Sequence, residues 1–165
     1  MTPERVFAKL AARVPPMVNM GGSTGAPEID MPTAAALCAG MGDEAFNAGL
    51  AAFALCPEAI EKTRITLHMR AMELSQRRWH DKAWARLAEK IKAHTGQPAS
   101  IVLANIAVSE MLYPHQWNHS LRASVLGVPQ STYHRHVAGR YKEVAAYLDA
   151  WTETARAHVV RAQRD

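Results

Sequence analysis

Apolar residues recur every three or four positions along most of this chain, which is the spacing of an α-helix with one buried face. Proline and glycine interrupt the pattern where such helices would end. The pattern predicts helices over residues 3–14, 33–39, 44–55, 57–78, 82–95, 100–112, 115–125, 129–138 and 140–163. Residues 100–112 are the most apolar segment, and the lack of a partner strand favours a central helix there. The predicted fold class is therefore all-α, a multi-helix bundle.

The last predicted helix carries a long apolar stripe. Its members follow one another at spacings of three and four: Tyr141, Val144, Leu148, Trp151, Ala155 and Val159. A stripe of this length must be covered, and we expect the cover to be either the preceding helices or a second protomer.

Residues 119–139, HSLRASVLGVPQSTYHRHVAG, have the pattern of two helices joined by a tight turn. Gly127 stands where such a turn requires a positive φ, which glycine adopts without steric cost. The side chains expected on the buried side are Ala123, Leu126, Val128, Tyr133 and Val137. The pattern predicts a helix-turn-helix that binds DNA, and the alternative is a helical hairpin used only for packing.

The second of these two helices leaves polar side chains on its outer side. They carry amide, hydroxyl, imidazole and guanidinium groups, which read base edges or hold phosphates in a major groove. The predicted DNA-binding residues are Gln130, Ser131, Thr132, His134 and Arg135 on this helix, flanked by Arg122 and Arg140. Ser131 or Thr132 is also expected to cap the helix, with Pro129 in its first turn.

Charge is distributed unevenly along the 165 residues, whose formal net charge is +4. Residues 1–60 hold three Lys or Arg against six Asp or Glu, and residues 61–165 hold sixteen against nine. This asymmetry favours a nucleic-acid face in the basic part and a protein contact in the acidic part. We expect three divisions: an N-terminal helix with an irregular arm (1–32), a helical core (33–113), and the helix-turn-helix with the long C-terminal helix (114–165).

Residues able to carry chemistry are present, but without the spacings that enzymes or metal sites need. Cys38 and Cys56 are far apart, which favours buried thiols in a reducing compartment. His115 and His119 are four apart, but no Cys or carboxylate is grouped near them to complete a closed zinc site. The GGSTG run at 21–25 lacks the ending and the preceding strand of a phosphate loop. We therefore expect no enzyme, no metal and no cofactor.

Membrane and export signals are missing from the sequence. No apolar run approaches the ~20 residues that span a bilayer, and the N-terminus has no signal-peptide core. The expectation is a soluble, cytoplasmic protein with no membrane partner.

The predicted helix-turn-helix and the helix after it resemble the Q-type late-gene antitermination proteins of lambdoid phages, of the phage 21 type. The resemblance covers roughly the last third of the chain, whereas residues 1–40 match no family. The residues that carry it are Leu121-Arg122-Ala123, Leu126-Gly127-Val128, Ser131-Thr132-Tyr133, Arg135, Tyr141, Val144 and Trp151.

The resemblance implies a factor that binds double-stranded DNA beside a late promoter in a bacterial host cell. Such a factor engages bacterial RNA polymerase paused there with its σ factor. It narrows the RNA-exit channel, so that nascent RNA cannot fold into a terminator hairpin. A homodimer on two half-sites, or polymerase as a second partner, would strengthen DNA binding. The alternatives are a repressor or activator that never travels with polymerase, and a small terminase subunit, whose helix-turn-helix usually leads the chain.

Overall fold

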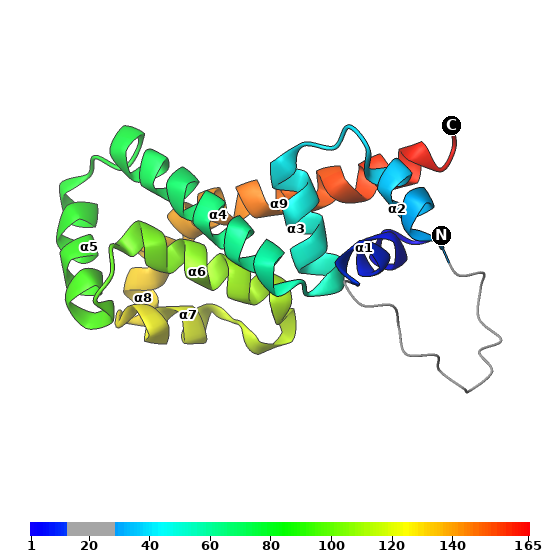
Figure 1. The fold of residues 1–165 in the computed structure, drawn as a ribbon. Helices are drawn as coiled ribbons and strands as arrows, with labels where there is room; N and C mark the ends of the chain where they lie inside the picture. Colours follow the sequence, from blue (N-terminus) through cyan, green and yellow to red (C-terminus); the bar gives the residue numbers. More distant parts are fainter. Residues whose placement is uncertain (13–28) are drawn as a thin grey trace. The chain divides into compact units, whose positions relative to one another are not determined.

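The computed structural model describes residues 1–12 and 29–165, and every regular element in this part of the chain is helical (Figure 1). The elements are α1 (Pro3–Ala11), α2 (Met31–Cys38), α3 (Asp43–Ala54), α4 (Pro57–Arg77), α5 (Lys82–Thr95), α6 (Ala99–Leu112), η1 (Pro114–Gln116), α7 (His119–Leu126), α8 (Gln130–Thr132), η2 (Tyr133–Val137) and α9 (Ala138–Ala162). The all-α prediction is confirmed for this part. The GGSTG run at 21–25 lies outside the described residues.

Several helices begin at side chains that satisfy the free N–H groups of a first turn. The Asp30 carboxylate accepts from the Thr33 N–H at 2.7 Å, at the start of α2. The Asp81 carboxylate accepts from the Ala83 N–H at 2.9 Å, which fixes the start of α5. Gly96 ends α5 in the left-handed conformation. The predicted helix between Asp81 and Gly96 is therefore confirmed at both ends.

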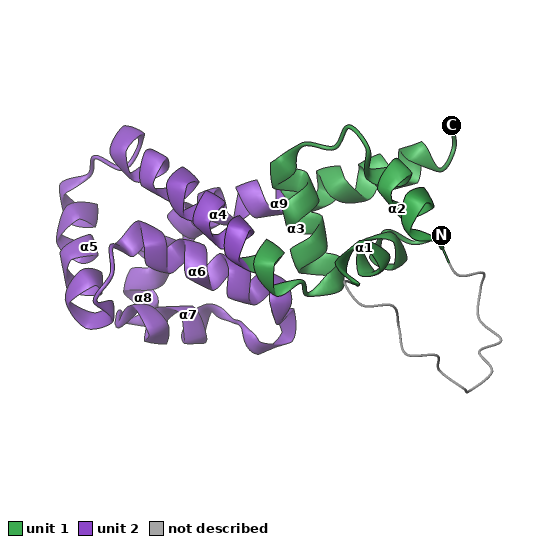
Figure 2. Cartoon of the chain, viewed as in Figure 1, with its two compact units in different colours: residues 1–60, 151–165 green, residues 61–150 purple. Residues whose placement is uncertain are grey.

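The chain forms two compact units, residues 1–60 with 151–165 and residues 61–150 (Figure 2). The units differ from the three predicted divisions because two long helices, α4 and α9, each contribute to both of them. All six members of the predicted α9 stripe are buried. Tyr141, Val144 and Leu148 belong to the second unit, and Trp151, Ala155 and Val159 to the first. No break in the apolar pattern marks the point where the helix changes units.

The first unit is built around Phe7 of α1. Gly49 of α3 lies against its ring, and a Cβ on Gly49 would come within 2.4 Å of the Phe7 Cζ. Ala155 and Val159 of α9 are buried in the same cluster, so this end of the stripe is covered by the chain itself. The Cys38 thiol is also buried there, and this burial raises its pKa. Both cysteines are free, and Cys56 is half-buried.

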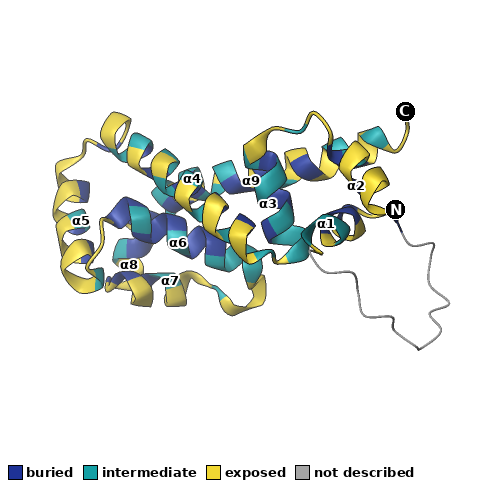
Figure 3. Cartoon of the chain, viewed as in Figure 1, coloured by how far each residue is buried: buried dark blue, intermediate teal, exposed yellow. Residues whose placement is uncertain are grey.

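The second unit is built around α6, none of whose residues is exposed (Figure 3). Helices α5 and α7 both pack against it. This confirms the prediction that the most apolar segment is central to a core. Trp79 is a core residue that the pattern analysis did not single out. Its ring meets Trp84 edge-on, with the ring centroids 5.5 Å apart.

Within residues 1–12 and 29–165, no helix is both long and apolar enough to cross a bilayer.

Candidate nucleic-acid interface

The turn after α7 has the predicted backbone and the predicted buried side. Helix α7 ends at Gly127, whose φ is +72°, and α8 begins three residues later. A Cβ on Gly127 would lie 2.4 Å from the His94 Cγ of α5, so the turn also needs glycine for space. The five side chains predicted to be buried are all buried, namely Ala123, Leu126, Val128, Tyr133 and Val137. The two helices therefore pack against each other through this shared buried side.

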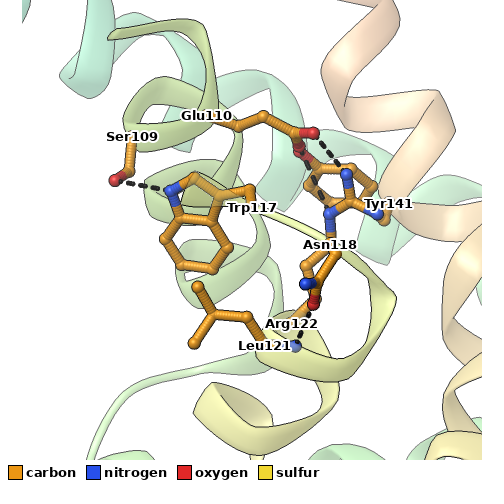
Figure 4. A network of polar contacts seen from close by, with 7 residues as sticks. All are labelled: Ser109, Glu110, Trp117, Asn118, Leu121, Arg122 and Tyr141. Atoms are coloured by element: carbon orange, nitrogen blue, oxygen red, sulfur yellow. Dashed lines mark hydrogen bonds and ion pairs between the residues drawn. The ribbon is translucent and has the colours of Figure 1, made fainter. Parts of the chain in front are cut away.

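The entry to α7 differs from the prediction of a helix starting at residue 115. Pro114 begins the short 3-10 turn η1, and the chain then extends through Trp117 to Asn118. The Asn118 side-chain oxygen accepts from the Leu121 N–H at 2.8 Å and so caps α7. The Trp117 Nε1 donates to the Ser109 Oγ at 3.1 Å, which anchors this entry to α6 (Figure 4). An asparagine satisfies a free N–H at a cap better than inside a helix, so the helix starts after it.

The second helix begins after Pro129 and does not end at Gly139. Pro129 is the cap residue, and no side chain bonds to the first turn, so the expected cap by Ser131 or Thr132 is wrong. The chain stays helical from α8 through η2 into α9, with no loop between these elements. One internal glycine costs a helix only about 1 kcal/mol, which burial of the stripe from Tyr133 onward exceeds.

A single π-helical turn, η2, interrupts the regular hydrogen bonding of this helix. The Ala138 N–H donates to the Tyr133 carbonyl five residues earlier. The wider turn accommodates one more residue, and Tyr133, Val137 and Tyr141, each four apart, are all buried. Turns of this kind are frequent at functional sites. Here the turn contains His134 and Arg135, two of the predicted DNA-binding residues.

The outer side of α8 and η2 presents the predicted polar surface. Gln130, Ser131, His134 and Arg135 are exposed, and Thr132 is half-buried. The His134 ring stacks on His119, the first residue of α7, with the centroids 4.7 Å apart and the planes 30° apart. The two helices thus support His134 jointly. We define these exposed residues, Gln130, Ser131, His134 and Arg135, as the α8 face.

Arg122 does not belong to this face, although the sequence placed it among the DNA-binding candidates. Its side chain is 12% exposed and is paired with Glu110 of α6. The Arg122 Nε donates to the Glu110 Oε2 at 3.2 Å, and its Nη2 bonds the other carboxylate oxygen. The guanidinium also lies 4.7 Å from the centroid of the Tyr141 ring, and the Tyr141 hydroxyl donates to Glu110 (Figure 4). Both partners, Glu110 of α6 and Tyr141 of α9, belong to helices of the core, so Arg122 is a structural residue here.

Arg140 is also occupied inside the second unit. Its guanidinium lies 4.5 Å from the centroid of the Trp84 ring of α5. The Nη1 donates to the His136 carbonyl at 2.6 Å, and the Nη2 is 3.9 Å from the Asp81 carboxylate. Its side chain is only 19% exposed. Arg140 therefore holds the N-terminal end of α5 against the start of α9, and we do not include it in the DNA-binding surface.

A cavity of about 490 Å³ lies behind the α8 face, between α6, α7 and α9. Small apolar residues such as Ala107 and Ala145 form part of its wall, and Glu110, Tyr141 and Asp149 contribute polar groups. Burial and then the nearby Glu110 raise the pKa of Asp149.

Because of Tyr141, the stability of the second unit is expected to fall at alkaline pH. Burial, followed by the hydrogen bond to Glu110, raises the pKa of Tyr141 well above its ordinary value of 10.0. The unfolded chain releases this proton near pH 10 and the folded chain does not, so the stabilisation is complete below about pH 10 and is lost as the pH rises above it. We expect Tyr141→Phe to flatten this loss in urea unfolding between pH 8 and pH 11. Identical pH profiles for the two proteins would contradict this assignment.

His115 and His119 do not lie on one helix. His115 lies in η1 and His119 starts α7, so the single helix face expected for the pair does not exist. Among residues 1–12 and 29–165, no three His, Cys, Asp or Glu side chains are grouped as metal ligands.

Glu110 was not among the residues predicted from the sequence, because its partners are 12 and 31 residues away and no local spacing indicates them.

Comparison of the chain with known proteins found no significant match. No protein-family profile matches the chain, and no curated protein and no solved structure matches it significantly. Only the geometry and chemistry of the α8 face, and of the helices that hold it, therefore indicate what it could bind.

Proposed function

We propose that this chain is a helix-turn-helix protein that binds double-stranded DNA by placing the α8 face in the major groove. The observation that carries the proposal is the division of one short segment into two sides. Its apolar residues hold α7 and α8 in a fixed crossing, and Gln130, Ser131, His134 and Arg135 remain exposed on the outside. A rigid helix start with free polar groups is what a recognition helix requires.

The chemistry of the α8 face suits base edges as well as phosphates. A glutamine amide can bond adenine in two places, and an arginine can bond guanine in two places. The Ser131 hydroxyl and the His134 ring can accept or donate according to the base or phosphate opposite them. Residues 61–150, which contain this face, carry thirteen Lys or Arg against seven Asp or Glu, and a net positive charge attracts a duplex.

We further propose that the regulatory role is transcription antitermination, with bacterial RNA polymerase and its σ factor as partners. This part of the proposal is supported by the resemblance of the last third of the chain to the Q-type factors. In that role the α8 face would hold the protein on DNA beside a promoter. Other surfaces would engage polymerase and the nascent RNA at the exit channel.

Arg135→Ala is expected to weaken binding to a selected duplex by about 1–3 kcal/mol, because a side chain that bonds a base is lost. Arg135 is exposed, so the unfolding temperature should stay unchanged. Arg161→Ala, which removes an equal charge from an exposed residue of the last turn of α9, is the matched control and should bind as the native protein does. Equal affinities for the two variants would remove Arg135 from the interface.

Terminator readthrough tests the regulatory half of the proposal. The template carries the late promoter beside the protein's own gene and an intrinsic terminator downstream. We expect the full chain to raise readthrough, and Arg135→Ala to abolish the gain at limiting protein. Unchanged termination with DNA binding intact would leave a repressor or activator. Ring-shaped oligomers in native mass measurements, with no effect on transcription, would instead favour a small terminase subunit.

A further inference from the structure

Helix α5 carries a row of exposed cationic side chains that have no ion-pair partner among the described residues. Lys82, Arg86 and Lys90 follow one another at intervals of four, and all three are exposed. Trp84, Leu87 and Ile91 bury the opposite side of the helix. None of the hydrogen bonds and ion pairs among the described residues involves the three cationic side chains. We call Lys82, Arg86 and Lys90 the α5 ridge.

The α5 ridge belongs to the helix that supports the turn before the α8 face. Near the C-terminal end of α5, the His94 ring fills the space where a Cβ on Gly127 would lie. Near its N-terminal end, Trp84 lies under the Arg140 guanidinium at the start of α9. Figure 1 shows the C-terminal end of α5 near α7, against which it packs. The ridge is therefore fixed relative to the α8 face at both of its ends.

We propose that the α5 ridge binds the phosphate backbone of the same duplex whose major groove receives the α8 face. The inference rests on the proposed function. Packed helices lie about 8–10 Å apart, and a major groove is about 12 Å wide. Helix α5 packs against α7 and meets the turn at Gly127 that precedes α8, so we place it over a strand that flanks this groove. The ridge spans about 12 Å along α5, and one strand carries a charge every ~3.4 Å of duplex axis, so it matches about three phosphates.

The chemistry of the α5 ridge favours phosphates over other partners. Its cations are separated on the exposed side by alanines, Ala83 and Ala85, with Glu89 the acidic residue there. Large apolar or aromatic side chains, which mark the centre of a protein interface, are missing from the exposed positions of α5. Long cationic side chains separated by small residues instead suit a repeating line of negative charge.

The test compares two triple variants of equal charge. One is Lys82→Gln, Arg86→Gln, Lys90→Gln, which removes the ridge. The control is Lys62→Gln, Arg161→Gln, Arg164→Gln, which removes three exposed cations elsewhere. Affinity of the full chain for a labelled 30-base-pair duplex of mixed sequence is measured between 50 and 200 mM salt. Circular dichroism verifies that each variant keeps its helix content and melting temperature.

Removing the ridge is expected to reduce the slope of log affinity against log salt by about three, because three phosphate contacts no longer release counterions. The fall in affinity from 50 to 200 mM salt then becomes roughly 40-fold smaller than that of the native chain. The control should change the slope by less than one, and Lys82→Arg with Lys90→Arg should preserve the native slope.

Two results would overturn the inference, and they are distinguishable. Equal slopes for the ridge variant and the control, with native DNA binding, would show that the ridge does not touch the duplex while the α8 face still does. If the native chain does not bind the duplex at 50 mM salt, both the proposed function and the proposed role of the ridge are overturned.

Discussion

Replacing Gly127 by alanine is expected to destabilise the protein by about 2–5 kcal/mol, because the substitution has two costs. The backbone there has a φ of +72°, and a left-handed conformation costs a residue with a Cβ about 1–2 kcal/mol. The new Cβ would also meet the His94 ring at 2.4 Å, and overpacking costs a further ~1–3 kcal/mol. Urea unfolding followed by the tryptophan signal measures the sum.

Two further variants separate these costs. Gly96 has a φ of +75° but nothing within 4 Å of the position where a Cβ would lie. Gly96→Ala should therefore show the backbone cost alone, about 1–2 kcal/mol. Adding His94→Ala to Gly127→Ala should recover the packing part, which a double-mutant cycle reports as a coupling energy. A Gly127→Ala protein no less stable than Gly96→Ala would show that the turn does not rest on His94.

Replacing Glu110 by glutamine is expected to destabilise the protein by about 2–4 kcal/mol, because it leaves the Arg122 charge without a counter-charge. Loss of one partner from a buried pair costs about 3–5 kcal/mol. The Arg122 side chain is 12% exposed and that of Glu110 is 26% exposed, so partial screening lowers this figure. Tyr141 also keeps only a neutral acceptor for its hydroxyl. Chemical unfolding at neutral pH measures the loss.

Glu143→Gln is the matched control for this substitution. Glu143 accepts from the Trp79 Nε1 at 2.6 Å and pairs with Arg78 at 3.1 Å. The Arg78 side chain is 64% exposed, so water screens its charge, and we expect a loss of only about 1 kcal/mol. Glu110→Gln with Arg122→Met should be more stable than Glu110→Gln alone, because the uncompensated charge is gone. If Glu110→Gln costs no more than Glu143→Gln, the network is not holding α6, α7 and α9 together.

The sequence predicted those features of the second unit that depend on neighbours in the chain. The positive φ of Gly127, the helix over 82–95 and the buried faces of α7 and α9 follow from residue type and a spacing of three or four. The π-turn was not predicted, and neither was the shift of the α7 start to His119. Both depend on competition between local hydrogen bonds, which apolar periodicity does not represent.

Contacts between distant residues could not be predicted from one sequence. Arg122 and Arg135 have the same side chain and stand 13 positions apart in the same segment. Only the structure shows that Glu110 and Tyr141 bind Arg122, whereas Arg135 is exposed. Similarly, nothing in the local pattern indicates that Arg140 lies over Trp84, 56 positions away. The number of candidate DNA-binding arginines therefore falls from three to one.

Selection of duplexes from a random library by the full chain tests whether the α8 face reads bases. The native protein should enrich one motif, and Arg135→Ala should enrich the same motif with preference relaxed at one or two adjacent positions. The ridge variant should enrich the native motif with weaker binding overall. Enrichment of no motif by the native protein, or of an identical motif by Arg135→Ala, would contradict the account.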